Sequence, residues 1–309
     1  MRRHVLLAAI AALALVSITG CDIGKITVGT TSKVLLRGQP SLQQEADYEM
    51  ARTAIPGALK TVESFWIVDP DNWRLTRILT EGYCQYGTAF VEDDWEVAKF
   101  AKDLEQIEYH NTRANHIFTR CLNFALRRLG TRWQKEIFEG PDVVAKLLKE
   151  TGSKHRFDMM FVGLALGSLV NHNLSRIEML SYLPTVEAIM TRVLELDAKN
   201  PPKNLQHAAL PYVALGMLHS GRPKAMGGEP EKARTEFMKA LEITKDKFLL
   251  ARTLMAYRVG LALNDKKFFH EQLKIVLETA PSVWPEQRLG NEVAHRKARR
   301  YLQKEKDLF

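Results

Sequence analysis

The sequence has none of the short motifs that most enzymes and nucleotide-binding proteins carry. It contains no Walker phosphate loop, no glycine fingerprint after a strand and no G-x-S-x-G elbow. Its histidines are scattered, and no pair has the HExxH spacing of a zinc protease. We therefore expect no enzyme, no metal site and no cofactor. A carboxylate pair for glycoside cleavage stays open, because the spatial pairing of Asp and Glu is not visible in a sequence.

Charge of one sign and cysteine are also scarce. The 309 residues carry a net charge of only +8, and basic residues alternate with acidic ones instead of forming a stripe, so we expect no nucleic-acid partner. The three cysteines stand at 21, 84 and 121. For Cys84 and Cys121 we expect two buried free thiols on helix faces, and a disulfide between them is the alternative.

The N-terminus has the three parts of a secretory signal. Arg2 and Arg3 precede an almost unbroken apolar run over residues 5–16, which is too short to span a bilayer of about 30 Å. The junction Ile18-Thr19-Gly20-Cys21 resembles the bacterial lipobox of aliphatic, small, small and Cys. We predict a lipoprotein signal peptide over 1–20 and lipid attachment at Cys21. The alternative is a plain signal peptide cut nearby, with Cys21 left as an ordinary thiol.

The prediction places the mature protein at a membrane, facing the periplasm. Asp22 directly after Cys21 is a signal for retention in the inner membrane of enteric bacteria, so it suggests that membrane. Residues 21–44 are rich in Gly, Thr and Ser and predict a flexible linker away from the lipid. After Cys21 no apolar run has transmembrane length.

Helical spacing dominates from residue 45 to the C-terminus, and strand patterns are hard to find, which predicts one all-α domain over 45–309. We expect the first helix to be kinked or split at Pro56. The expected helices are 42–67, 73–91, 93–109, 114–129, 157–172, 184–196, 205–219, 231–243, 247–263, 266–279 and 286–304, with a polar insert over 132–149.

The best internal repeat is typical of a tetratricopeptide (TPR) unit. Ala233, Phe237 and Ala240 have the spacing of its second helix, and Leu215-Gly216 stands at the matching place in the preceding helix. Other copies are degraded and irregularly spaced. We predict an α-solenoid of TPR-like hairpins interrupted by inserts. A helical bundle with accidental matches is the alternative.

Three ordered strings stand out along the chain. They are Gly82-Tyr83 with Tyr86-Gly87-Thr88-Ala89-Phe90-Val91-Glu92, then Arg222-Pro223 with Gly227-Gly228 and Pro230-Glu231-Lys232-Ala233, then Pro285-Glu286-Gln287-Arg288-Leu289 with Asn291 and Ala294. Together they resemble one known family, the T component (TatT) of TRAP-type transporters. The resemblance spans residues 46–301. It implies a periplasm-facing lipoprotein with divergent TPR-like helices, an apolar channel in each subunit and a trimer around a periplasmic solute-binding protein. It implies no catalytic residue.

Six residues are candidates for contact with a ligand or partner. Four of them are aromatic: Tyr83, Tyr86 and Phe90 recur at helical spacing, and Trp66 stands on the preceding helix. Such a stripe of aromatic side chains either packs in the core or lines a channel. Arg222 belongs to a turn or to a channel mouth, and Gly227 supplies a turn that can use positive φ. Arg288 stands near the start of the last helix, which is basic. The basic face of that helix is either solvated or in contact with an acidic partner or lipid.

Three functions stay open. The first is an accessory of TRAP uptake that binds the solute-binding protein and an apolar or organic-acid ligand. The second is a TPR scaffold for assembly of the envelope or of pili. The third is a stand-alone carrier of an apolar ligand.

Overall fold

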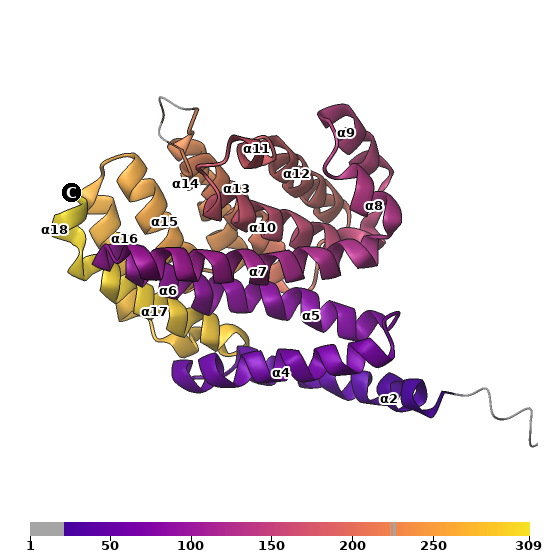
Figure 1. Cartoon of the computed structure of the whole chain (residues 1–309). Coiled ribbons are helices and arrows are strands. Elements are labelled where there is room, and N and C mark those ends of the chain that lie inside the picture. Colours follow the sequence, from indigo (N-terminus) through magenta and orange to yellow (C-terminus); the bar gives the residue numbers. More distant parts are fainter. Residues whose placement is uncertain (1–21, 223, 225–226) are drawn as a thin grey trace, which may run out of the picture.

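The computed structural model describes residues 22–222, 224 and 227–309, and every regular element in these ranges is helical (Figure 1). The all-α prediction is therefore confirmed. Within the described ranges, no helix is long and apolar enough to cross a membrane. The predicted signal peptide and the predicted lipid site at Cys21 lie outside the described residues.

The helices follow the predicted order closely. The π-helix η1 and then α6 continue α5 without a break, so one rod spans residues 73–101. The bounds expected for the helices 73–91, 93–109 and 114–129 are therefore wrong, because the helix breaks at Lys102, in the left-handed region, and α7 begins at Leu104. The elements are α2 (Ile23–Gly38), α3 (Pro40–Gln43), α4 (Tyr48–Val68), α5 (Trp73–Tyr86), η1 (Gly87–Val91), α6 (Glu92–Ala101), α7 (Leu104–Leu129), α8 (Thr131–Glu136), α9 (Pro141–Glu150), η2 (Ser153–His155), α10 (Arg156–His172), α11 (Ile177–Leu180), α12 (Leu183–Lys199), α13 (Leu205–Ser220), α14 (Pro230–Ile243), α15 (Leu249–Ala262), α16 (Lys266–Glu278), η4 (Pro281–Val283), η5 (Pro285–Gln287), α17 (Arg288–Gln303) and α18 (Glu305–Leu308).

Local sequence fixes many of the helix starts. The side chains of Asp47, Asn72 and Asp103 accept hydrogen bonds from backbone N–H groups in the first turns of α4, α5 and α7. Pro230 occupies the first turn of α14, and Gly227 before it has φ of +80°, as the turn prediction required. The predicted split at Pro56 is wrong, since α4 runs on through this residue.

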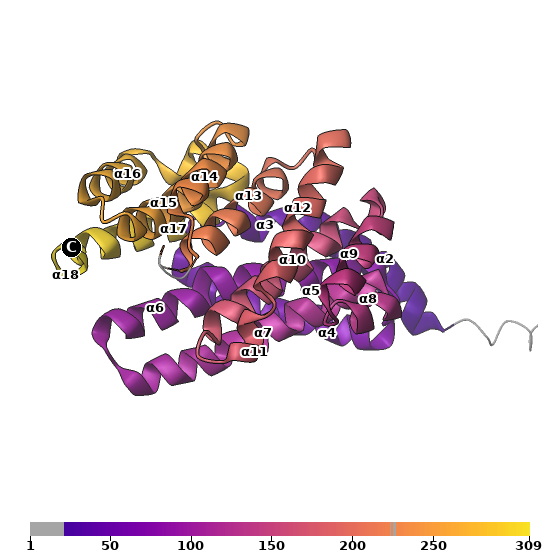
Figure 2. The ribbon, with the colours of Figure 1, turned by 90° about the horizontal axis from the view of Figure 1, so that it is seen from above.

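Consecutive helices pack as antiparallel hairpins, and the hairpins stack into a curved array (Figures 1 and 2). The last of them, from α13 to α17, form the tightest stack, with α14 against α13 and α16 against α15. The long helices α5, α7 and α10 pack together in the N-terminal half and carry most of the large hydrophobic core. This arrangement places helices from both halves around a common interior.

The predicted linker is corrected by the structure, because residues 23–38 form helix α2. Asp22 caps the helix, and Val28 and Ser32 are buried against the body. Leu35 and Leu36 pack against the same core. The Gly and Thr content makes this segment a weak helix former in isolation, but packing of one face overrides that local preference.

The two cysteines are bonded, so the expectation of free thiols is wrong. Cys84 on α5 and Cys121 on α7 form a disulfide, with their Cα atoms 5.4 Å apart. Both side chains are buried, as expected. Their separation of 37 residues gave no sign of pairing, because only the side-by-side packing of α5 and α7 brings them together.

Candidate ligand cavity

A cavity of about 320 Å³ lies in the interior shared by the two halves of the array. Its walls come from α3, α4, α5 and η1 on the N-terminal side, from α10, α12 and α13, and from α15 and α17. Most of its lining is aliphatic or aromatic, with Leu59, Ile78, Phe90, Phe161 and Leu210 among the side chains. A concave, largely apolar space with a few polar groups is the usual form of a small-molecule site.

The π-helix η1 contributes three of the lining residues, Thr88, Ala89 and Phe90. Gly87 at its start lies against α7, where a Cβ atom would be 2.7 Å from Cε1 of Phe118. Such wide turns are often found at functional sites, because they re-aim the side chains of an otherwise regular helix. Here the turn brings Phe90 into both the cavity wall and the core.

One part of the wall is built from glutamines around a buried carboxylate. Glu81 on α5 is 4% exposed and accepts hydrogen bonds from Nε2 of Gln39 at 3.0 Å, Gln43 at 3.3 Å and Gln85 at 3.2 Å. Nε2 of His207 lies 3.0 Å from the same carboxylate. Burial opposes the charge of Glu81, but His207, the charge of Arg77 and the amide of Gln39 hold its pKa below the usual value. All three glutamines line the cavity, so Glu81 fixes the orientation of polar groups that face its interior.

Two arginines add positive charge to a cavity wall that also contains the carboxylate of Glu92. Arg222, after α13, and Arg258, on α15, both line it. Neither forms a salt bridge with any carboxylate of the described residues, and Nε of Arg222 is buried with no hydrogen-bond partner there. Lys297 also lines the cavity, but its Nζ lies 3.5 Å from Oδ1 of Asp93 and 2.5 Å from Oε2 of Glu96. The unpaired guanidinium groups could meet an acidic group on a ligand.

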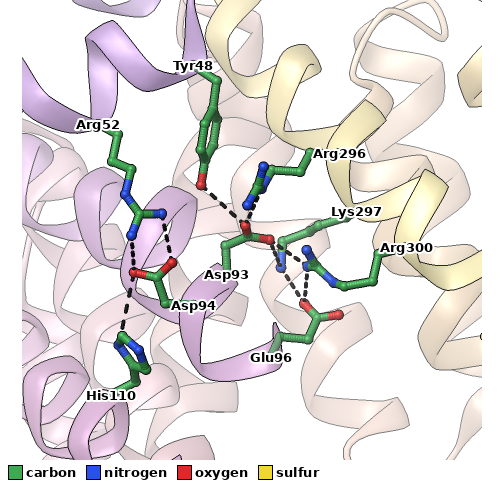
Figure 3. A network of polar contacts seen from close by, with 9 residues as sticks. All are labelled: Tyr48, Arg52, Asp93, Asp94, Glu96, His110, Arg296, Lys297 and Arg300. Carbon is green, nitrogen blue, oxygen red and sulfur yellow. Dashed lines mark hydrogen bonds and ion pairs between the residues drawn. The ribbon is translucent and has the colours of Figure 1, made fainter. Parts of the chain in front are cut away.

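A buried ion network joins the N-terminal helices to α17 next to the cavity (Figure 3). Asp93 on α6 is fully buried and accepts from Nε of Arg296 at 2.8 Å and from Nη2 of Arg300 at 2.5 Å. The hydroxyl of Tyr48 donates to it at 3.2 Å. Burial of Asp93 opposes its ionisation, but Lys297 and the two arginines lower its pKa to about 2. Lys297 is the residue of this network that lines the cavity, and its charge is paired with Asp93 and Glu96.

The structure separates the six candidate residues into two groups. Tyr86, Phe90 and Arg222 line the cavity. Tyr83 is buried against Phe124, with ring centroids 6.0 Å apart, and Trp66 meets the same ring edge-on at 5.2 Å. Arg288 lies outside the lining and its Nε donates to Oε1 of Glu292 at 3.4 Å. Tyr83 and Trp66 thus belong to the core.

Sequence reasoning missed the glutamines, Glu81, His207 and Arg258. A signal was present for His207, because it is a polar residue in a helix that is apolar on nearly all sides, whereas Glu81 is one of several polar residues of the amphipathic helix α5. Such a residue must have buried polar partners. Which residues these partners are depends on α3, α5 and α13 meeting, and no local pattern shows that.

A family model described as the TRAP transporter T-component matches residues 44–309. The chain belongs to this family. No curated protein matches the chain. The match begins directly after α3 and covers every later helix, so it includes nearly the whole cavity wall.

Membership gives the chain an accessory role in a TRAP transport system, and the T-component is not a known enzyme family. The described part of this T-component holds no group of three or more His, Cys, Asp or Glu side chains that could bind a metal ion.

Proposed function

We propose that this T-component is a periplasm-facing lipoprotein that binds the solute-binding protein of a TRAP system and holds a ligand in its cavity. The observation that carries the proposal is the cavity of about 320 Å³ in a chain that belongs to an accessory family of transporters. A space of that size, walled by both halves of the array, has the dimensions of a small-molecule site.

The lining favours a ligand with an apolar body and an acidic group. The aliphatic and aromatic wall would remove the body from water, which stabilises the complex by about 25 cal/mol for each Å² of apolar surface buried. Arg222 and Arg258 would pair with a carboxylate, because a guanidinium donates two parallel hydrogen bonds to its oxygens. The glutamines held by Glu81 would meet neutral polar groups.

Lipid at Cys21 would hold the helical array beside its partner at the membrane. Two acyl chains give a stable anchor, whereas a single chain gives a marginal one. We also propose that three copies gather around the solute-binding protein. Asp22 favours the inner membrane as the site of the anchor.

A scaffold for envelope or pilus assembly is the second candidate function. The observation that favours it is the stack of helical hairpins itself, since such arrays offer long surfaces for protein partners. A scaffold needs no interior ligand. The bound content of the cavity therefore distinguishes the two functions.

Co-purification of the full chain from its own membranes in mild detergent tests the proposal. We expect a TRAP solute-binding protein in the eluate, and native mass spectrometry should show a small acidic molecule that leaves on denaturation. Consistent recovery of envelope-assembly proteins with an empty cavity would overturn the proposal and favour the scaffold. Ala145 is exposed on α9 and does not line the cavity, so the Ala145→Trp variant is the control and should carry the same bound molecule as the native protein.

A further inference from the structure

Helix α2 presents an apolar and basic face to the outside of the molecule. Ile23, Ile26 and Val34 are 78%, 58% and 67% exposed. Their spacing of three and eight residues places them on one side of the helix, opposite the buried Val28 and Ser32. A helix with large aliphatic side chains on its outer side has an unpartnered face.

The charge of α2 is of one sign. Between residues 23 and 38 there are three basic side chains, Lys25, Lys33 and Arg37, and no acidic one. None of the three forms a salt bridge with a carboxylate of the described chain, whereas most exposed basic residues of the last helices do. Lys33 and Arg37 share the outer side of the helix with Ile26. The face is therefore suited to a surface that is both apolar and anionic.

Two more exposed aliphatic side chains lie at the helix end beside α2. A Cβ atom on Gly24 would lie 3.3 Å from Cγ1 of Val68, so the last turn of α4 packs beside the first turn of α2. Ile67 and Val68 there are 71% and 43% exposed. In both views α2 lies at the edge of the array, at the end remote from α18 (Figures 1 and 2).

The position of α2 in the chain brings this face to a membrane. Cys21, the proposed site of lipid, stands two residues before Ile23, and the apolar run over residues 5–16 precedes it. With lipid at Cys21, the chain would enter the bilayer within a few residues of α2. A partner for the outer face is then supplied by the bilayer surface itself.

We propose that α2 lies flat in the headgroup layer of an anionic bilayer. Its exposed aliphatic side chains reach the acyl boundary, and Lys33 and Arg37 pair with lipid phosphates. The helix thereby fixes the orientation of the whole array relative to the membrane, which a flexible lipid tether alone would not do. This inference rests on the proposed anchoring of the chain, but it concerns a different contact.

Spin labelling of the mature protein in vesicles tests the contact. A label at Thr30→Cys would lie in the middle of the outer face, and a label at Met238→Cys would lie on the exposed side of α14. In vesicles of phosphatidylcholine with phosphatidylglycerol, we expect collisions of the Thr30→Cys label with a water-soluble nickel complex to fall several-fold and those with oxygen to rise. The Met238→Cys label should remain water-accessible.

Two further variants make the test specific. In the double variant Ile26→Glu, Val34→Glu, the label at position 30 should be accessible to water. In the double variant Lys33→Gln, Arg37→Gln, the burial of that label in the bilayer should weaken, and most at low salt. A label that stays water-accessible in the anionic vesicles would overturn the proposal. So would dipolar broadening between copies in the absence of lipid, because it would mean that the face binds a second copy of the chain.

Mass spectrometry of residue 21 separates this inference from the anchor. If Cys21 carries no lipid, the proposed anchoring fails, and the unacylated protein is then tested on the same vesicles. Binding that is lost in the Ile26→Glu, Val34→Glu variant would support the membrane face, and no binding would overturn it. If Cys21 is acylated and the label stays in water, the anchor stands and the inference about α2 fails.

Discussion

The ring of Phe237 on α14 occupies the space where a side chain on Gly216 of α13 would begin. A Cβ atom on Gly216 would lie 2.7 Å from Cδ2 and Cε2 of that ring, which is fully buried. The same relationship recurs in the next hairpin, where a Cβ on Gly260 would lie 2.9 Å from Cβ of Phe269. A small residue on the first helix thus sets how closely the second can approach.

We predict that Gly216→Ala destabilises the protein by about 1–3 kcal/mol, because the added methyl must displace a ring that is packed on every side. Urea unfolding followed by circular dichroism measures the effect. Gly57→Ala on α4 is the matched control, since a Cβ atom there would meet no neighbouring side chain within 4 Å. The control should be neutral or stabilising by about 0.5–1 kcal/mol. Equal midpoints for both variants would contradict the close packing.

The disulfide should be necessary for full stability. The double variant Cys84→Ala, Cys121→Ala should lose about 2–5 kcal/mol, because the unfolded chain is no longer constrained by the bond between α5 and α7. The midpoint of urea unfolding, with and without reductant, measures this loss. Reductant should lower the midpoint of the native protein and leave that of the double variant unchanged. Alkylation of residues 84 and 121 in unreduced, unfolded protein would argue against the bond.

Stability should fall in acid through the network around Asp93. Its pKa is about 2 in the folded protein against an ordinary 3.8, so its contribution is complete above about pH 4 and is lost as the pH falls towards 2. Asp93→Asn should be less stable by about 3–5 kcal/mol at neutral pH, because Lys297 and the arginines lose a buried partner. Below pH 4 its stability should depend less on pH than that of the native protein.

Thermal unfolding over pH 2–7 measures both parts of the Asp93 prediction. Asp71→Asn is the control, because its side chain is 95% exposed and its contact with Arg127 at 3.5 Å is solvated. Parallel pH profiles for the native protein and Asp93→Asn would mean that Asp93 is not the group that titrates. Carboxylates remote from Asp93 are common to both proteins and cancel in the comparison, whereas Glu96 shares Lys297 and Arg300 with Asp93 and does not.

A bulky side chain in the cavity should block a ligand without unfolding the protein. Ala214 on α13 lines the cavity and is half-buried, so Ala214→Trp should fill part of the space. Anilinonaphthalene sulfonate is a dye with an apolar aromatic body and an anionic sulfonate group. We expect its fluorescence to rise on mixing with the native protein and to rise much less with this variant. Ala145→Trp should behave as the native protein does. Equal enhancement in both variants would place the dye elsewhere.

The sequence determined the helical class and most helix positions, because apolar spacing and capping residues act within a few turns. Asp47, Asn72 and Asp103 begin helices where a short polar side chain can accept from free N–H groups. The spacing of Leu215-Gly216, Ala233 and Phe237 likewise indicated a hairpin, and Gly216 and Phe237 are in contact. The family resemblance was also carried by the sequence and is confirmed.

Only the tertiary structure decided which distant residues meet. The bond between Cys84 and Cys121, the contacts of Gln39 and Gln43 with Glu81 and the pairing of Asp93 with α17 all join separate segments of the chain. The helix α2 was missed for the same reason, because its stability comes from packing on the body and not from its Gly and Thr residues. Local spacing sets which way a side chain points from its own helix, whereas the packing of helices sets what it touches.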